Sequence, residues 1–218
     1  MMQGQGEEGR AAKPLGGMPA TDDEIREKYL ERAIRELNQF TRDLQACPVC
    51  PRGNLMPVLG SGHPQADILL LKYAPASAEI EEGVAFYGRA GTALMKSLRR
   101  LDIDPLAVYG TLCVKCPVAD TSLAAPECVG RLVEEFAIVA PKIVVVMGPE
   151  ALATLNELAL PLASAVQERP GEIQSLTPSV DALYVPDIDE ALDEEDAKRA
   201  FWTAFRALGE WWADFPPY

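Results

Sequence analysis

The sequence predicts an α/β protein, a three-layer α/β/α sandwich whose central layer is a four-stranded parallel sheet. Short apolar segments alternate along the chain with amphipathic helical segments, the order that a parallel sheet requires. The apolar residues in these segments are consecutive rather than alternating, which is typical of strands buried on both faces. The chain has 218 residues, of which 48% are hydrophobic, so it is long enough to bury one sizeable core.

The N-terminal part of the chain divides into a leader and a first helix. Residues 1–20 are rich in glycine, glutamate and alanine without periodicity, which predicts a disordered leader. A single domain is expected over residues 21–218. Thr21 and Glu24 have the spacing of a capping box, so a helix is expected to begin there and to run to Leu44. Its apolar residues recur at helical spacing: Ile25, Tyr29, Ala33, Ile34, Leu37 and Phe40.

The strands and the remaining helices follow in alternation. Four apolar segments are expected to form the sheet: 67–74, 108–115, 142–147 and 182–185. Helices are expected at 91–101, 125–139 and 149–158, and a last amphipathic helix contains Phe201, Phe205, Leu208, Trp211 and Trp212. Ligands of such sheets bind at the carboxyl ends of the strands, so functional residues are expected in the loops at 73–91, 112–128, 147–150 and 185–190.

Four of the five cysteines form two pairs, Cys47 with Cys50 and Cys116 with Cys128. Two residues between Cys47 and Cys50 allow one turn to direct both sulfurs at a single metal centre, and the second pair would complete a four-thiolate site. Thiolates suit an iron–sulfur cluster or zinc, and the number of ligands does not separate the two. The chain has one histidine, so a mixed Cys/His zinc site is poorly supplied. The alternative is that the four cysteines are unrelated and simply buried.

The charge and the hydropathy of the chain narrow the functional classes. No apolar run is long enough to span a bilayer and the N-terminus lacks the apolar core of a secretory signal, so a cytoplasmic protein without membrane contact is expected. The cysteine pairs are then metal ligands rather than disulfides. The net charge is -13, which opposes binding to a phosphate backbone unless the acids are segregated.

A glycine-rich turn opens one of the expected helices. Gly88 and Arg89 begin the segment Gly88-Arg89-Ala90-Gly91, where free backbone amides beside an arginine are able to hold a phosphate or another oxygen-rich ligand. A plain helix-initiating turn explains the same residues.

Taken in order, these motifs resemble the family 4 uracil-DNA glycosylases over about residues 25–210. The resemblance rests on Cys47-x-x-Cys50, Gly60-Ser61-Gly62, Ala74-Pro75, Phe86-Tyr87-Gly88-Arg89-Ala90-Gly91, Val114-Lys115-Cys116, Cys128 and the segment 141–148. It implies a uracil-DNA glycosylase-like fold, a link to DNA repair and a four-iron four-sulfur cluster held by Cys47, Cys50, Cys116 and Cys128, with zinc as the alternative. Cys113 has no counterpart among these ligands and is interpreted as a small buried residue.

The chain departs from the family at the residues that handle the base. Tyr73 stands where the resemblance expects the acid that positions the water, Leu112 where it expects the asparagine that reads uracil, and Val185 where it expects a histidine. Leucine offers no hydrogen bond to a base edge. Phe86, which stacks on the base in the family, is retained. With Gly88 and Arg89, these residues are the predicted pocket.

Nearby charged residues offer no obvious replacement for the missing groups. We interpret Glu79, Glu81 and Glu82 as a solvated acidic turn, and His63 as an exposed loop residue at the opposite end of the sheet. The segment 187–196 holds seven acids where the family presents its DNA-inserting loop, so weak or no DNA binding is expected.

Three hypotheses follow. The first, which we favour, is a catalytically defective uracil-DNA glycosylase homologue that serves as a binding module or contacts a protein partner. The second is an enzyme that acts on another base or nucleotide through Tyr73, Lys72 or a further residue, which a basic patch on the folded surface would favour. The third is a redox-sensing iron–sulfur protein, which a solvent-exposed cluster would favour.

Overall fold

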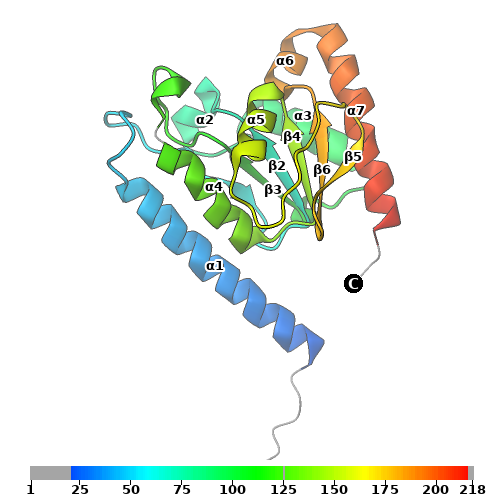
Figure 1. Ribbon diagram of the computed structural model, residues 1–218, viewed down its shortest axis with the longest axis horizontal. Coiled ribbons are helices and arrows are strands. Elements are labelled where there is room, and N and C mark those ends of the chain that lie inside the picture. Colours follow the sequence, from blue (N-terminus) through cyan, green and yellow to red (C-terminus); the bar gives the residue numbers. More distant parts are fainter. Residues whose placement is uncertain (1–20, 125, 216–218) are drawn as a thin grey trace, which may run out of the picture.

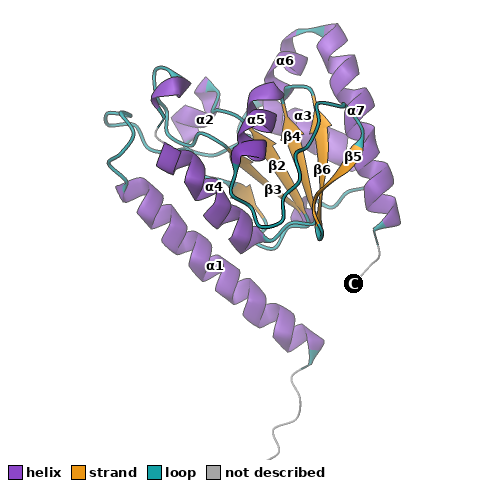
Figure 2. Ribbon diagram, in the orientation of Figure 1, coloured by secondary structure: helices purple, strands orange, loops and turns teal. Residues whose placement is uncertain are grey.

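The computed structural model describes residues 21–124 and 126–215, so the predicted leader at 1–20 lies outside the described residues. It contains a six-stranded sheet of order β1-β3-β2-β4-β6-β5. The four inner strands are parallel, and helices cover both faces (Figures 1 and 2). The predicted α/β fold class with its central four-stranded parallel sheet is therefore confirmed.

The four parallel strands lie within or close to the predicted apolar segments. They are β2 (Ile68–Lys72), β3 (Val108–Leu112), β4 (Ile143–Met147) and β6 (Val180–Val185). Every residue of the first three is buried, as consecutive apolar residues require. Two antiparallel edge strands, β1 (Ser61–Gly62) and β5 (Ile173–Thr177), were not predicted because one is only two residues long and the other has only two apolar residues, Ile173 and Leu176, without a regular period.

The carboxyl ends of the parallel strands are in register. Lys72 pairs with Leu112 on one side and with Met147 on the other, and Met147 pairs with Val185. Residues paired in a parallel ladder point to the same face of the sheet. These four side chains consequently form one row across the edge where ligands of such folds bind.

The helices divide between the two faces of the sheet. One face is covered by α4 (Pro126–Val139) and α5 (Pro149–Glu157), and the other by α3 (Arg89–Arg100), α6 (Ile188–Asp193) and α7 (Glu195–Asp214). The short helix α2 (Ser77–Glu82) follows β2 at the carboxyl edge. The predicted helices begin or end within about two residues of the observed ones, while α2 and α6 are too short to show a clear period.

The first helix, α1 (Asp22–Ala46), has the predicted capping box. The Glu24 amide donates to the Thr21 hydroxyl at 3.3 Å, and the Thr21 amide donates to the Glu24 carboxylate at 2.9 Å. The helix packs on α4, and its buried residues are Ala33, Phe40 and Leu44 (Figure 1). Apolar side chains of the helix that remain exposed are Ile25, Tyr29 and Ile34. Helix α1 thus carries the chain along α4 to the first cysteine pair.

No helix in the described part of the chain combines the length and the apolarity needed to cross a membrane.

Candidate functional site

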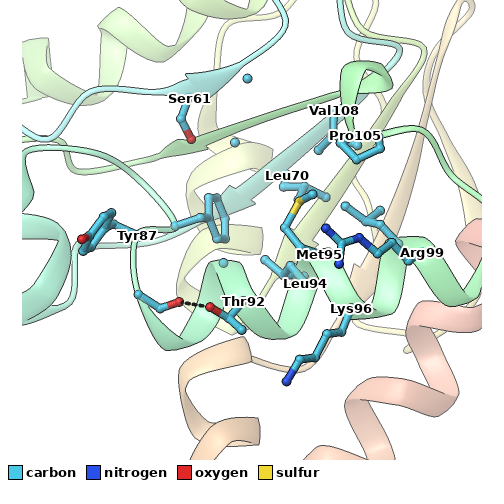
Figure 3. A pocket seen from close by; sticks show the side chains of 16 residues that line it. Ser61, Leu70, Tyr87, Thr92, Leu94, Met95, Lys96, Arg99, Pro105 and Val108 are labelled. Carbon is cyan, nitrogen blue, oxygen red and sulfur yellow. Dashed lines mark hydrogen bonds between the residues drawn. The ribbon is translucent and has the colours of Figure 1, made fainter.

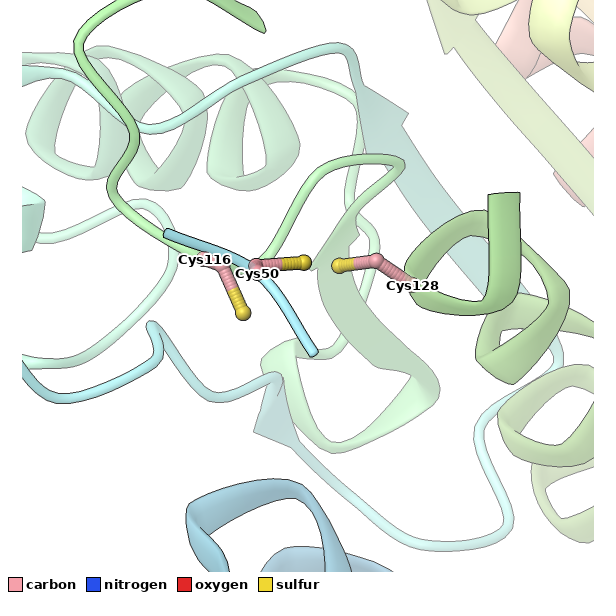
Figure 4. A group of neighbouring side chains, drawn as sticks. All are labelled: Cys50, Cys116 and Cys128. Carbon is pink, nitrogen blue, oxygen red and sulfur yellow. The ribbon is translucent and has the colours of Figure 1, made fainter. Parts of the chain in front are cut away.

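Three cysteines from distant parts of the chain converge beside the sheet. The sulfur atoms of Cys50, Cys116 and Cys128 all lie within 4.8 Å of one another, and all three residues are buried (Figure 4). They come from the loop after α1, the loop after β3 and the first turn of α4. Cys47 is half-buried at the C-terminal cap of α1 and lies outside this group of three, so its role as fourth ligand stays a prediction.

Arg52 holds the loop that carries the first pair. Its guanidinium donates to the carbonyl oxygens of Gln45 at 2.7 Å and Cys47 at 3.2 Å, and also to that of Leu55. These bonds close the loop around Cys50. The remaining predicted cysteine, Cys113, is fully buried in the core under α4, and burial raises the pKa of its thiol to about 12, as expected for a small structural residue.

The three thiols are placed to act as metal ligands. The hydrogen bond from the Cys116 thiol lowers the pKa of Cys128 to about 5, and the N–H groups of Lys115 and Cys116 act in the same direction. The hydrogen bond between these two thiols raises the pKa of Cys116, and burial of Cys116 raises it further. The arrangement thus favours the thiolate form of Cys128 beside the thiol of Cys116. Such soft sulfur donors fit zinc or an iron–sulfur cluster.

A buried polar network joins the thiol site to the sheet. The Lys115 ammonium lies 2.7 Å from a Glu135 carboxylate oxygen, and both side chains are fully buried. Tyr109 and Thr111 of β3 donate to the two Glu135 oxygens, each at 2.7 Å, and Lys115 also donates to the Leu112 carbonyl. Lys115 precedes Cys116, and Glu135 lies on α4, whose first turn carries Cys128. The network therefore fixes the two cysteine-bearing segments relative to each other.

A second buried lysine lies at the carboxyl edge of the sheet. The Lys72 ammonium is 2.7 Å from Glu79 of α2 and 2.7 Å from Asp189 of α6. Lys72 is 1% and Glu79 0% exposed, so the pair is sealed from water. Glu79 also accepts from the backbone amides of Ala76, at 2.6 Å, and Phe86. These contacts connect α2, the Phe86 turn and α6 across the edge.

Two of the predicted pocket residues share the row of Lys72. Leu112 packs with Val58 and Ala85, and Val185 packs in the core under α3 and α7. Both side chains are fully buried. Tyr73, one residue after Lys72, packs instead on the core of the opposite face. The structure therefore brings Leu112 and Val185 to one face and directs Tyr73 away from them.

Phe86 is held in a strained turn over the same face. Its φ of 58° is left-handed, and its ring lies on β3 at Gly110, where an added Cβ would be 2.5 Å from the Phe86 ring. The Lys72 ammonium lies 5.8 Å from the centroid of the ring. Phe86 thus packs against the sealed ion pair.

Gly88 and Arg89 begin α3 as predicted. Gly88 is the N-terminal cap with a φ of 85°, which glycine adopts without strain. The exposed Arg89 donates to the Leu192 carbonyl and to the Asp193 carboxylate, both at 2.9 Å. Arg89 consequently ties α3 to α6 in this conformation.

An open pocket of about 530 Å³, which Phe86 helps to line, lies between α3 and the β1–β3 edge (Figure 3). Its lining includes Ser61, Phe86, Tyr87, Met95 and Arg99. Tyr73, Leu112 and Val185 are not among its lining residues. The open space near Phe86 is thus separate from the row at the carboxyl edge.

Comparison with known proteins assigns this architecture. The family model described as the uracil DNA glycosylase superfamily matches residues 59–206. The chain belongs to this superfamily. It is 23% identical over 188 residues to a type-4 uracil-DNA glycosylase of Archaeoglobus fulgidus, covering 81% of this chain and 94% of that protein. It is also 30% identical over 124 residues to a type-4 uracil-DNA glycosylase of Sulfurisphaera tokodaii, covering 51% of this chain and 54% of that protein.

The interpretation of Glu79 as a solvated residue is wrong. Glu81 and Glu82 are exposed, but Glu79 is fully buried because it neutralises Lys72 and caps the start of α2. Asp189, one of the seven acids of 187–196, is half-buried and lies 2.7 Å from the Lys72 ammonium. His63 is half-buried rather than exposed. Its backbone amide donates to the carbonyl of Val108 at the start of β3, so it does lie at the opposite end of the sheet from the carboxyl edge.

Sequence reasoning missed both buried lysine networks of this glycosylase homologue. Lys72 follows four apolar residues of β2, and a lysine at the end of a strand buried on both faces requires a carboxylate partner. That signal was present in the sequence. The identity of the partners was not, because Glu79 and Asp189 reach Lys72 only through the positions of α2 and α6.

Proposed function

We propose that this chain is a uracil-DNA glycosylase-like iron–sulfur protein that does not excise uracil and that acts as a binding or protein-partner module linked to DNA repair. In this proposal Cys47, Cys50, Cys116 and Cys128 hold a four-iron four-sulfur cluster, whose contribution is to cross-link the loop after α1 to β3 and α4. The convergence of three buried thiols supports the assignment. Zinc is the alternative occupant.

The observation that carries the proposed loss of excision is the sealed Lys72 ion pair. Excision requires space for an extruded base, a group that reads it and a carboxylate or histidine that assists the water and the leaving base. At the carboxyl edge the row contains Leu112, Lys72 and Val185, and the carboxylates nearest to Lys72 are already bound to it. The side chains of Leu112 and Val185 offer no hydrogen bond. A base placed there would lose its hydrogen bonds to water and gain none from these residues.

The same residues predict weak DNA binding. Of the three basic residues near the predicted pocket, Lys72 and Lys115 are buried in ion pairs and Arg89 bonds to α6. Few cations therefore remain at this edge to neutralise phosphates. Binding of uracil-containing single- and double-stranded DNA should be measured by anisotropy at several salt concentrations.

We expect a slope of log affinity against log salt between zero and about two, since each phosphate contact contributes about one. A steep slope with tight binding would contradict the proposal. It would favour the second candidate function, an enzyme of altered base specificity, for which the basic character of α3 is the supporting observation. That helix contains Arg89, Lys96, Arg99 and Arg100 and no acidic residue. Incubation with duplexes that carry other deaminated or oxidised bases tests this second function directly.

A further inference from the structure

A second groove runs between α3 and the pair α6 and α7, and it shares Gly88 and Arg89 with the predicted pocket. Its volume is about 880 Å³, within the range of protein ligand sites. Apolar side chains form its floor: Ile188, Ala191, Leu192, Phe201 and Trp202. The sheet separates this groove from the thiol site, because α3, α6 and α7 pack on one face while α4 packs on the other. Neither Leu112 nor Val185 lines it.

The groove has the opposite charge to the chain as a whole. Its lining contains five basic side chains and one acidic side chain, whereas the net charge of the chain is -13. On the α3 wall, Lys96 and Arg100 form no salt bridge with any residue that the structure describes. In Figure 3, Lys96 extends from α3 on the side away from Ser61 and Tyr87. The Arg100 guanidinium lies 5.6 Å from the centroid of the Trp202 ring.

On the α7 wall of the groove, the basic side chains of Lys198 and Arg199 form only exposed ion pairs among the described residues. Lys198 is 3.2 Å from Glu195, and Arg199 is 3.4 Å from Asp196. All four side chains are at least 65% exposed, and such pairs contribute little to stability. Lys198 and Arg199 are therefore free to exchange these neighbours for the carboxylates of a ligand.

We propose that this groove binds a short acidic peptide segment of a partner protein that inserts an aromatic or aliphatic side chain between α3 and α7. The apolar floor would take the anchor, and Lys96 and Arg100 with Lys198 would bind the flanking carboxylates. This inference rests on the proposed role as a partner-binding module and names the class of partner. A nucleic-acid strand fits less well, because its phosphates gain nothing from the apolar floor.

Selection of 12-residue peptides from a random displayed library on the full-length chain tests the proposal. We expect selected peptides to be enriched in aspartate and glutamate around one tryptophan, phenylalanine or leucine. Their affinity for the double variant Lys96→Glu, Arg100→Glu should fall roughly 100-fold, because like charges then face the ligand. The matched control is Lys28→Glu, Arg35→Glu on exposed positions of α1, which changes the charge equally and should leave affinity unchanged.

Three results would overturn the proposal: selected peptides without acidic residues, equal losses in the two double variants, or an oligothymidine that binds the groove more tightly than any selected peptide. Trp202→Ala should weaken peptide binding while preserving the thermal unfolding temperature to within a few degrees, which separates loss of the anchor from loss of the fold. Uracil excision is measured in parallel, so failure of peptide binding and failure of the proposed non-excising function are distinguishable.

Discussion

Two buried lysines at neighbouring strand ends have different consequences. Lys115, three residues beyond β3, pairs with Glu135 and holds the segments that carry Cys116 and Cys128. Lys72, the last residue of β2, pairs with Glu79 and Asp189 and fills the face to which Leu112 points. Lys115 belongs to a segment that resembles family 4 uracil-DNA glycosylases, whereas Lys72 precedes Tyr73, where the resemblance expects an acid.

This difference teaches that similar buried ion pairs serve different regions of one fold. Around the thiols, Lys115 and Glu135 hold the segments that carry Cys116 and Cys128. At the carboxyl edge, Leu112 and Val185 stand where the resemblance expects polar groups, and Lys72 closes the face with its carboxylate partners. Both lysines are nearly or fully buried, so each requires its carboxylate partner for the fold, but only the Lys115 network should affect the metal.

Removal of a thiol ligand should have the largest effect. We expect the purified protein to be brown and to contain about four iron atoms per chain. Cys116→Ser should abolish the colour and lower the solubility, because the cluster cross-links segments far apart in the sequence. Absorbance and iron analysis measure this, and Cys113→Ala is the control that should retain the colour. A colourless, fully folded protein with one zinc would refute the iron–sulfur assignment.

The two networks should respond differently to matched substitutions. Glu135→Gln leaves the buried Lys115 without its anionic partner, and the double variant Glu79→Gln, Asp189→Asn does the same for Lys72, so each change should destabilise the protein by about 3–5 kcal/mol in urea unfolding. At equal destabilisation, only Glu135→Gln should lower the iron content, since Glu135 alone touches the segments of Cys116 and Cys128. Equal iron loss in both variants would break the distinction between the two regions.

Restoring the family residues at the carboxyl edge should cost stability and return little activity. Leu112→Asn and Val185→His each place a polar group in a fully buried apolar site, with an expected loss of about 1–3 kcal/mol. Tyr73→Glu should cost less because Tyr73 is only half-buried. The triple variant should release at most a trace of uracil, because Lys72 still occupies the face and such groups act together. Efficient excision by Leu112→Asn alone would contradict this reading.

The smallest expected effect concerns Asp187, which caps α6 beside the same edge. Its carboxylate accepts from the Asp189 amide at 2.6 Å, yet burial raises its pKa, with the negative charge of Asp189 adding to the rise and Lys72 opposing it. The folded state thus binds the proton more tightly than the unfolded state, so stability should fall as pH rises through this pKa. Asp187→Asn keeps the cap and removes that charge. Its unfolding free energy should match the native protein in acid and exceed it slightly at neutral pH.

The sequence predicts the strands and helices of the three layers better than it predicts the contacts at the carboxyl ends of the strands. Consecutive apolar residues identify the four parallel strands, and the capping box at Thr21 identifies the start of α1, because both signals are local. Short elements such as α2 and α6 have no period of their own, and their positions depend on Lys72. Cysteine spacing anticipated the convergence of Cys50, Cys116 and Cys128, but burial of Glu79 depends on contacts between segments that no local pattern encodes.

Release of uracil by the iron-loaded native protein tests the central claim most directly. The protein, in molar excess over a labelled single-stranded oligonucleotide with one uracil, is incubated for hours and the strand is cleaved with alkali at any abasic site. We predict that the strand remains intact while the same preparation contains about four iron atoms per chain. Cleavage that rises with protein concentration and disappears in a Phe86→Ala variant purified in parallel would show that the carboxyl edge is not closed to chemistry.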